Sequence, residues 1–255
     1  MKAMFRYVLL TALRDRLFAV LALLALCLFV ATWILGQASL VEREAASIAL
    51  AAGSLRTLVV LGLVVFICFH VQRLFDSREI EALLARPMGR GAFVLAYWLA
   101  GAAVACLLAV IPVAGLLLLQ PPSTGGLLLW SGSLLLECLL VVAMALTISL
   151  AMDSAVAATL ATLAVYTLGR EMGFLLAITS GQAGALQATG AVGWLDILLQ
   201  GVAALVVRLD LFGQSDWLVN GPDAGFGAYW FVAQGVVYTA LLLVVATVDL
   251  RKRKF

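Results

Sequence analysis

One acidic side chain stands alone inside a long apolar stretch of this sequence. Glu137 is the sole carboxylate between Glu81 and Asp153. An ionisable side chain near the middle of a membrane span costs about 2.5–3.5 kcal/mol on insertion scales, and such residues commonly mark substrate paths or proton relays. Glu137 could therefore face a translocation path, take up a proton or bond to a neighbouring helix. The structural alternative is a protonated, hydrogen-bonded side chain at a helix interface, and the sequence leaves both readings open.

The other residue types that perform chemistry are scarce. His70 is the only histidine, and the lysines are Lys2, Lys252 and Lys254. A phosphate-binding loop needs a lysine after its glycines, so this chain cannot contain one, and any nucleotide energy must come from another subunit. The four cysteines lie in different apolar runs, without the spacing of a metal site or a disulfide framework. We expect no catalytic residue, no bound cofactor and no metal, and we do not expect an enzyme.

The elements that position these residues follow from composition. The 255 residues are 65% hydrophobic and 12% charged, and their mean hydropathy is +1.14. Soluble domains are about half apolar and a quarter charged, so the expected fold class is an all-α integral membrane protein with one transmembrane domain. A helix needs about 20 apolar residues to cross a bilayer. The apolar runs predict six spans, at 17–36, 55–73, 91–119, 127–152, 154–170 and 225–248.

Three segments are expected outside these spans. Residues 1–16 mix basic and apolar side chains, which predicts an interfacial helix. Residues 76–86 form a short helix between the second and third spans. Residues 171–224 lack a clear span and are expected to form interfacial or re-entrant helices on the outer side. The spacing Gly169-x-x-x-Gly173 permits close helix packing, although this pattern is common by chance.

A six-span topology divides the basic residues unequally. Twelve of the sixteen lie on the side of both termini and of residues 73–90, and the other side holds Arg43, Arg56, Arg170 and Arg208. The positive-inside rule therefore places both termini in the cytoplasm. Arg56 is expected at the outer rim of the second span, with its side chain reaching the headgroups. A seventh crossing would move the basic C-terminal cluster outside, so six spans are preferred.

The densest group of charges follows the second span. Residues 76–86 combine charged side chains with apolar ones at helical spacing, and Pro87 ends the helix because it lacks an N–H group. Such a helix offers ion pairs and an apolar ridge to a partner in the cytoplasm. The residues expected to make this contact are Asp76, Arg78, Glu79, Ile80, Glu81, Leu83, Leu84 and Arg86. A basic loop held by anionic lipid is the alternative.

A resemblance to a known family rests on this segment. Arg78-Glu79-Ile80-Glu81-Ala82-Leu83-Leu84-Ala85-Arg86-Pro87-Met88-Gly89-Arg90 resembles the acidic–Leu-Leu–x–x-Pro–x–x-Arg segment between the second and third spans of ABC-2 type ABC transporter permeases. The basic Leu13-Arg14-Asp15-Arg16, the long outer segment and the short basic tail are also similar. The chain departs from the family at Tyr97-Trp98, where a lysine is frequent. The resemblance implies that residues 76–86 are a coupling helix that docks into an ATP-binding subunit.

The same resemblance implies a function and a set of partners. The chain would be the permease subunit of an ATP-driven transporter in a bacterial-type inner membrane, exporting an apolar or amphiphilic substrate. Its partners would be an ATP-binding cassette subunit, which binds ATP and Mg²⁺, a second copy of itself or a related permease, and membrane lipid, but no nucleic acid. Two other classes remain open: a proton-coupled secondary carrier that uses Glu137, and a non-transporting membrane scaffold.

Overall fold

Six helices in the described part of the chain are long and apolar enough to cross a membrane. The computed structural model describes residues 8–12, 16–38, 43–77, 89–119, 123–181, 198, 200–203, 207–221 and 228–252, and these ranges contain helices and turns but no strand. The six long helices are α2 (Arg16–Ala38), α3 (Arg43–Asp76), α5 (Arg90–Leu118), α6 (Thr124–Ala151), α7 (Ala155–Gly181) and α11 (Ala228–Lys252). The expectation of an all-α, multi-pass membrane protein is confirmed.

Two of these helices extend well beyond the apolar runs that predicted them. α3 begins at Arg43 rather than at Leu55, and α7 continues to Gly181 rather than ending near Arg170. Residues 43–54 are rich in alanine, the strongest helix former, and Glu44 lies in the first turn, where the helix dipole favours an acidic side chain. Hydropathy locates the membrane-spanning part of a helix, whereas propensity carries the helix further.

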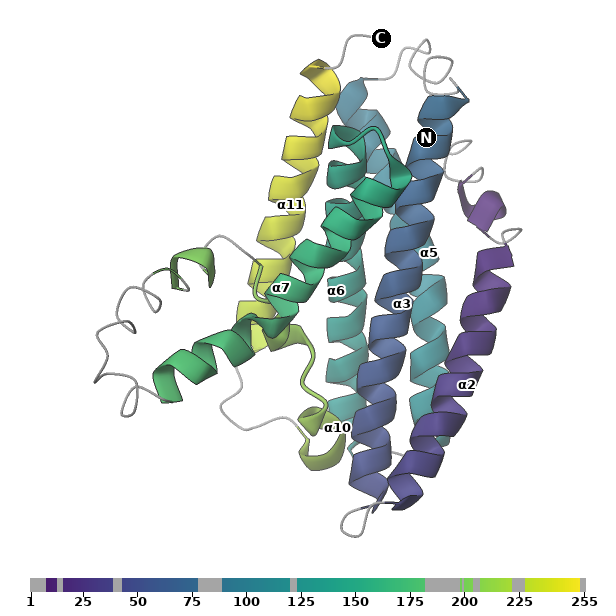
Figure 1. Ribbon diagram of the computed structural model, residues 1–255, viewed down its shortest axis with the longest axis vertical. Helices are drawn as coiled ribbons and strands as arrows, with labels where there is room; N and C mark the ends of the chain where they lie inside the picture. The colour runs from purple at the N-terminus through teal and green to yellow at the C-terminus, as the bar shows by residue number, and fades with distance from the viewer. Residues whose placement is uncertain are drawn as a thin grey trace.

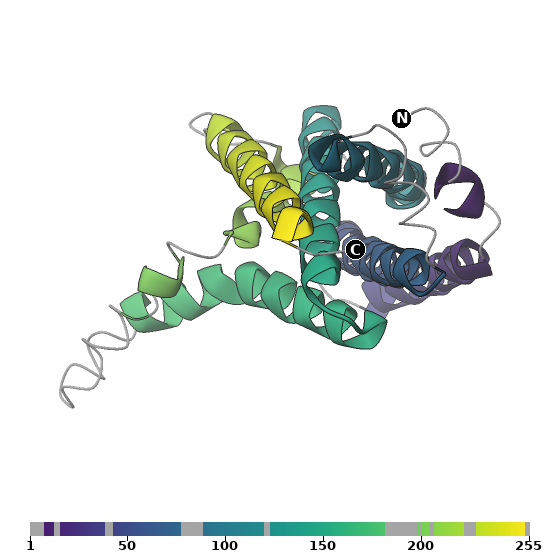
Figure 2. The ribbon, with the colours of Figure 1, turned by 90° about the horizontal axis from the view of Figure 1, so that it is seen from above.

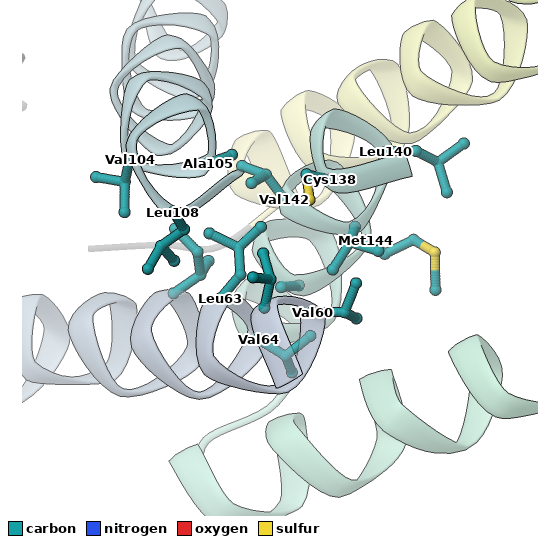
Figure 3. Packing of buried hydrophobic residues seen from close by; sticks show 14 of the residues in the cluster. Val60, Leu63, Val64, Val104, Ala105, Leu108, Cys138, Leu140, Val142 and Met144 are labelled. Carbon is teal, nitrogen blue, oxygen red and sulfur yellow. The ribbon is translucent and has the colours of Figure 1, made fainter. Parts of the chain in front are cut away.

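α3 and α6 form the centre of the bundle. In each, 67% of the residues in the most apolar window are buried, against 17% in α2 and 22% in α7 and α11. Figure 1 shows α3 and α6 running nearly parallel through the molecule, and in Figure 2 α2 and α11 lie on opposite sides of them. Leu63 of α3, Leu108 of α5 and Val142 of α6 meet in the packed core (Figure 3). α2, α7 and α11 therefore present most of their apolar surface outward.

The C-terminal end of α11 lies beside the start of α5. Arg90 Nη1 donates to the carbonyl oxygens of Leu250, at 3.0 Å, and Arg251, at 2.7 Å. α3 ends at the same end of the bundle, where it carries Arg73 near its last residue. Arg43 lies at the opposite end of α3. Basic residues of three helices therefore gather at one end of the bundle, in agreement with an even number of crossings between them.

Gln72 links the C-terminal end of α3 to that of α6 through two hydrogen bonds. Its Nε2 donates to the carbonyl oxygens of Ser149, at 3.0 Å, and Met152, at 2.7 Å. These carbonyls belong to the last turn and C-cap of α6, where main-chain acceptors lack partners within their own helix.

Replacing Gln72 by leucine is expected to lower the free energy of unfolding by about 1–2 kcal/mol, because one buried and one partly buried carbonyl group lose their donor. SDS-induced unfolding in mixed micelles measures the change. Gln37→Leu is the matched control, because Gln37 lies exposed at the end of α2. Equal stability of the two variants would contradict the prediction.

Candidate functional site

Glu137 is fully buried and forms an ion pair with Arg56. The Nη1 atom of Arg56 lies 2.6 Å from Oε2 of Glu137, and the side chains are 1% and 0% exposed. The expectation that Arg56 lies at the outer rim is wrong. Because α3 begins at Arg43, Arg56 lies about 20 Å along the helix from its first residue. Its charge is therefore inside the bundle, opposite the single carboxylate of α6.

The second carboxylate oxygen of Glu137 faces α7. The Tyr166 hydroxyl donates to Oε1 at 2.9 Å, and Nη1 of Arg170 lies 3.9 Å from the same oxygen. Tyr166 is buried, whereas the Arg170 side chain is 25% exposed. Both oxygens of Glu137 are thus bonded, and the carboxylate connects α3, α6 and α7. We call Arg56, Glu137, Tyr166 and Arg170 the central cluster.

The guanidinium of Arg56 makes further contacts beside the ion pair. Its Nη2 donates to the Trp130 carbonyl at 3.1 Å and to the Ser133 hydroxyl at 2.9 Å. Its carbon Cζ also lies 4.7 Å from the centre of the Trp130 ring, a cation–π distance. The fourth contact, from Nη1 to the Phe212 carbonyl at 2.8 Å, reaches a different part of the chain. A charge this deep needs such a set of acceptors, because an unpaired buried ion is strongly destabilising.

The Phe212 carbonyl belongs to a segment of the region that was expected on the outer side, and we call it the outer segment. This segment, residues 207–221, contains a 3₁₀ helix, η2 (Leu209–Phe212), and a short α-helix, α10 (Asp216–Asn220). Phe212 and Leu218 are fully buried, and Phe212 stacks edge-on against Phe231 of α11 at 5.5 Å. Of the expected outer region, residues 207–221 are therefore packed between the long helices, toward the lower end of the view in Figure 1.

Arg170 holds the same segment from α7. Its Nη1 donates to the Leu209 carbonyl at 3.2 Å and its Nη2 donates to the Gly213 carbonyl at 3.4 Å. Two arginines on different helices thus bind the main chain of the outer segment, Arg56 at Phe212 and Arg170 on either side of it. Beside them, the hydrogen bond from Arg208 to Asp210, at 2.8 Å, raises the pKa of the Arg208 guanidinium.

The glycine pair of α7 lies against this segment. A Cβ atom added to Gly169 would come within 2.5 Å of the Val207 carbonyl oxygen, and one added to Gly173 would overlap the Asp210 carboxylate. The spacing that permits packing of two long helices is used here for the approach of Val207 and of the 3₁₀ helix η2. The absence of side chains at these two positions lets residues 207–210 lie directly on α7.

Sequence reasoning identified Glu137 but not its partners. Arg56 is the only charged residue between Leu55 and Val71, and Glu137 is the only charged residue in the run 127–152. Two lone, opposite charges in neighbouring central helices are a signal that could have paired them. Tyr166 and the Phe212 carbonyl give no such signal, because their role depends on how α7 and the outer segment pack.

The residues expected to contact an ATP-binding subunit are described only at their first position. Asp76 is the final residue of α3 rather than the cap of a separate helix, and the Ser77 amide donates to the Arg73 carbonyl at 3.0 Å. The remaining residues, Arg78, Glu79, Ile80, Glu81, Leu83, Leu84 and Arg86, lie outside the described residues. α3 therefore connects the central cluster directly to the charged segment.

Two further polar features, His70 and an open cavity, lie outside the central cluster. His70 is 5% exposed and its ring stacks on Phe66 at 5.4 Å, an environment typical of helix packing. A cavity of about 930 Å³ lies between the first turns of α3 and α10, where Arg43, Glu44 and Asp216 form part of its lining. No group of three histidine, cysteine or acidic side chains within the described ranges could hold a metal ion.

The cluster is suited to holding helices together more than to proton chemistry. The two Glu137 oxygens accept hydrogen bonds from Arg56 of α3 and Tyr166 of α7, so the carboxylate links three helices. No protein-family model matches this chain, and no curated protein sequence matches it.

Proposed function

We propose that this chain is the permease subunit of an ATP-driven ABC transporter. The observation that carries the proposal is the charged segment after Asp76, whose residues resemble the coupling segment of ABC-2 type permeases. Two features support it. The described residues contain six candidate membrane spans and the sequence has no phosphate-binding loop, as expected of a conduit that depends on a separate ATPase. The segment also follows α3, a 34-residue helix at the centre of the bundle, so a force applied there would act on the core.

The proposed topology places both termini and residues 76–86 in the cytoplasm of a bacterial-type cell. Its support is the distribution of charge, since Arg73, Arg90, Arg251 and Lys252 lie toward one end of the bundle and Arg43 lies at the other. The positive-inside rule assigns the richer end to the cytoplasm. The cavity beside Arg43 would then open on the outer side.

The proposed partners are an ATP-binding cassette subunit that carries ATP and Mg²⁺, a second copy of this chain or a related permease, and lipid. The outward apolar faces of α2, α7 and α11 support contact with lipid or a second permease. An apolar or amphiphilic cargo suits a bundle of this composition, and export is the proposed direction.

Charge reversal in the 76–86 segment tests the proposal. The double variant Glu79→Arg/Glu81→Arg, and separately Leu84→Ala, are expected to reduce co-purification of an ATP-binding subunit from native membranes at least tenfold. The reason is that the ion pairs and the apolar ridge of the docking helix are removed. Glu44→Arg is the matched control, because it reverses an acidic side chain at the other end of α3. Undiminished co-purification of an ATPase with both variants would refute the coupling role.

The two alternatives make different predictions. A carrier would move cargo without a partner, driven by a pH gradient, and would lose this activity in Glu137→Gln. The paired geometry of Glu137 favours a structural role, because both of its oxygens are bonded within the bundle. A scaffold would not co-purify with an ATPase.

A further inference from the structure

α3 is bonded to α6 at two levels. Near one end, Gln72 binds the terminal carbonyls of α6. Sixteen residues earlier, or about 24 Å along the helix axis, Arg56 binds Glu137 of α6. Bonds at both levels resist sliding of α3 along α6, because any shift of one helical turn would break all of them. α3 and α6 are thus expected to move as one body.

The outer segment is attached to this body through Arg56. The Nη1 atom that binds Glu137 also binds the Phe212 carbonyl, so one side chain joins α3, α6 and the segment. A second polar attachment, Arg170, comes from α7, in which 22% of the residues of the most apolar window are buried. The segment's own aromatic side chains, Phe212 and Trp217, pack on Phe231 of α11, at 5.5 and 6.0 Å.

We infer that Arg56 is a positioning residue that carries a displacement of α3 to residues 207–213 of the outer segment. The inference rests on the proposed function for the origin of the displacement, which would begin at the charged segment after Asp76. The attachment itself depends only on the contacts of Arg56. Its geometry places the same guanidinium between a carboxylate of the core and a main-chain carbonyl of the segment, so the two cannot separate without breaking a buried charge-assisted hydrogen bond.

The test measures exposure of the segment. Gln214 is exposed and follows the attachment, so Gln214→Cys reports on its position through its labelling rate with a membrane-impermeant maleimide. The exposed native cysteines, Cys27 and Cys106, are first replaced by alanine. The double substitution Arg56→Met/Glu137→Met is then made in this background. It removes the attachment through Arg56, and neither charge of the ion pair is left without its partner. Thr57→Val is the matched control, because Thr57 is exposed and bonds only within α3.

In the absence of nucleotide, the double variant is expected to label at least threefold faster than the parent, and Thr57→Val is expected to label at the parent rate. An unchanged rate in a folded, monodisperse double variant would overturn the inference. If that variant does not fold, Arg56→Gln/Glu137→Gln replaces it, since two amides can bond to each other while the shorter side chain no longer reaches Phe212. The same threefold criterion applies.

A second comparison uses the complex with its ATPase. In the parent, ATP with vanadate is expected to change the labelling rate of Gln214→Cys at least threefold relative to the nucleotide-free complex, and in the double variant this response is expected to vanish. An equal response in both would overturn the inference and leave the proposed function intact. Failure of any ATPase to co-purify would instead refute the proposed function, and the nucleotide-free comparison would still decide whether Arg56 holds the segment.

Discussion

Replacing Glu137 by leucine is expected to lower the free energy of unfolding by about 3–5 kcal/mol, the range for breaking a buried ion pair from one side. The variant leaves Arg56 with its charge inside the bundle, where it is 1% exposed. A guanidinium cannot release its proton at any pH that the protein tolerates. The remaining acceptors from Trp130, Ser133 and Phe212 bind the guanidinium but do not neutralise it.

Arg56→Met is expected to cost less than Glu137→Leu, although it breaks the same pair. Glu137 then keeps the hydrogen bond from Tyr166 to Oε1, and the guanidinium of Arg170 remains 3.9 Å from the same oxygen. The double variant Arg56→Met/Glu137→Leu is expected to recover most of the lost stability, because neither buried charge of the pair remains without its partner. We therefore expect the parent and the double variant to be the most stable, Arg56→Met to be less stable and Glu137→Leu to be the least stable.

SDS-induced unfolding in mixed micelles compares these variants, with Glu171→Leu as the control for loss of an exposed carboxylate on α7. If the double variant were less stable than both single variants, the two side chains would be acting through different partners. The ion pair would then not be the unit of stability.

Gly169→Ala is expected to destabilise the protein by about 1–3 kcal/mol, although alanine is the better helix former. The added Cβ would come within 2.5 Å of the Val207 carbonyl oxygen, so the outer segment must move away from α7. That movement would also strain the bonds from Arg170 to the carbonyls of Leu209 and Gly213. The neighbouring backbone is the obstacle, and no change of rotamer can relieve it.

The matched control is Gly132→Ala, on α6, where a Cβ would meet nothing within 4 Å. There the usual helix preference should apply, and the variant is expected to gain about 0.5–1 kcal/mol. Opposite signs for the two substitutions, measured as above, would establish that Gly169 is needed for contact with the outer segment. A stabilised Gly169→Ala would show that residues 207–210 do not lie against α7.

Much of the architecture follows from local sequence. Runs such as 17–36 and 127–152 are long and free of Lys and Arg, and burial of their polar main chain in lipid requires helix. Composition therefore determined the class of protein, the number of candidate spans and the position of the lone carboxylate. The start of α3 and the end of α7 were predicted less well. Residues 43–54 are rich in alanine, which extends a helix without being strongly hydrophobic.

The central cluster was decided only by tertiary structure. Glu137 was recognisable as an unusual residue, but its burial against Arg56 depends on the lateral packing of α3 on α6, which no local pattern specifies. The same holds for the Phe212 carbonyl, a main-chain group that any residue would supply. Residue type shows which side chains require partners. Only the folded chain shows which groups become those partners, because ion pairs and hydrogen bonds depend on distances between atoms that are far apart in sequence.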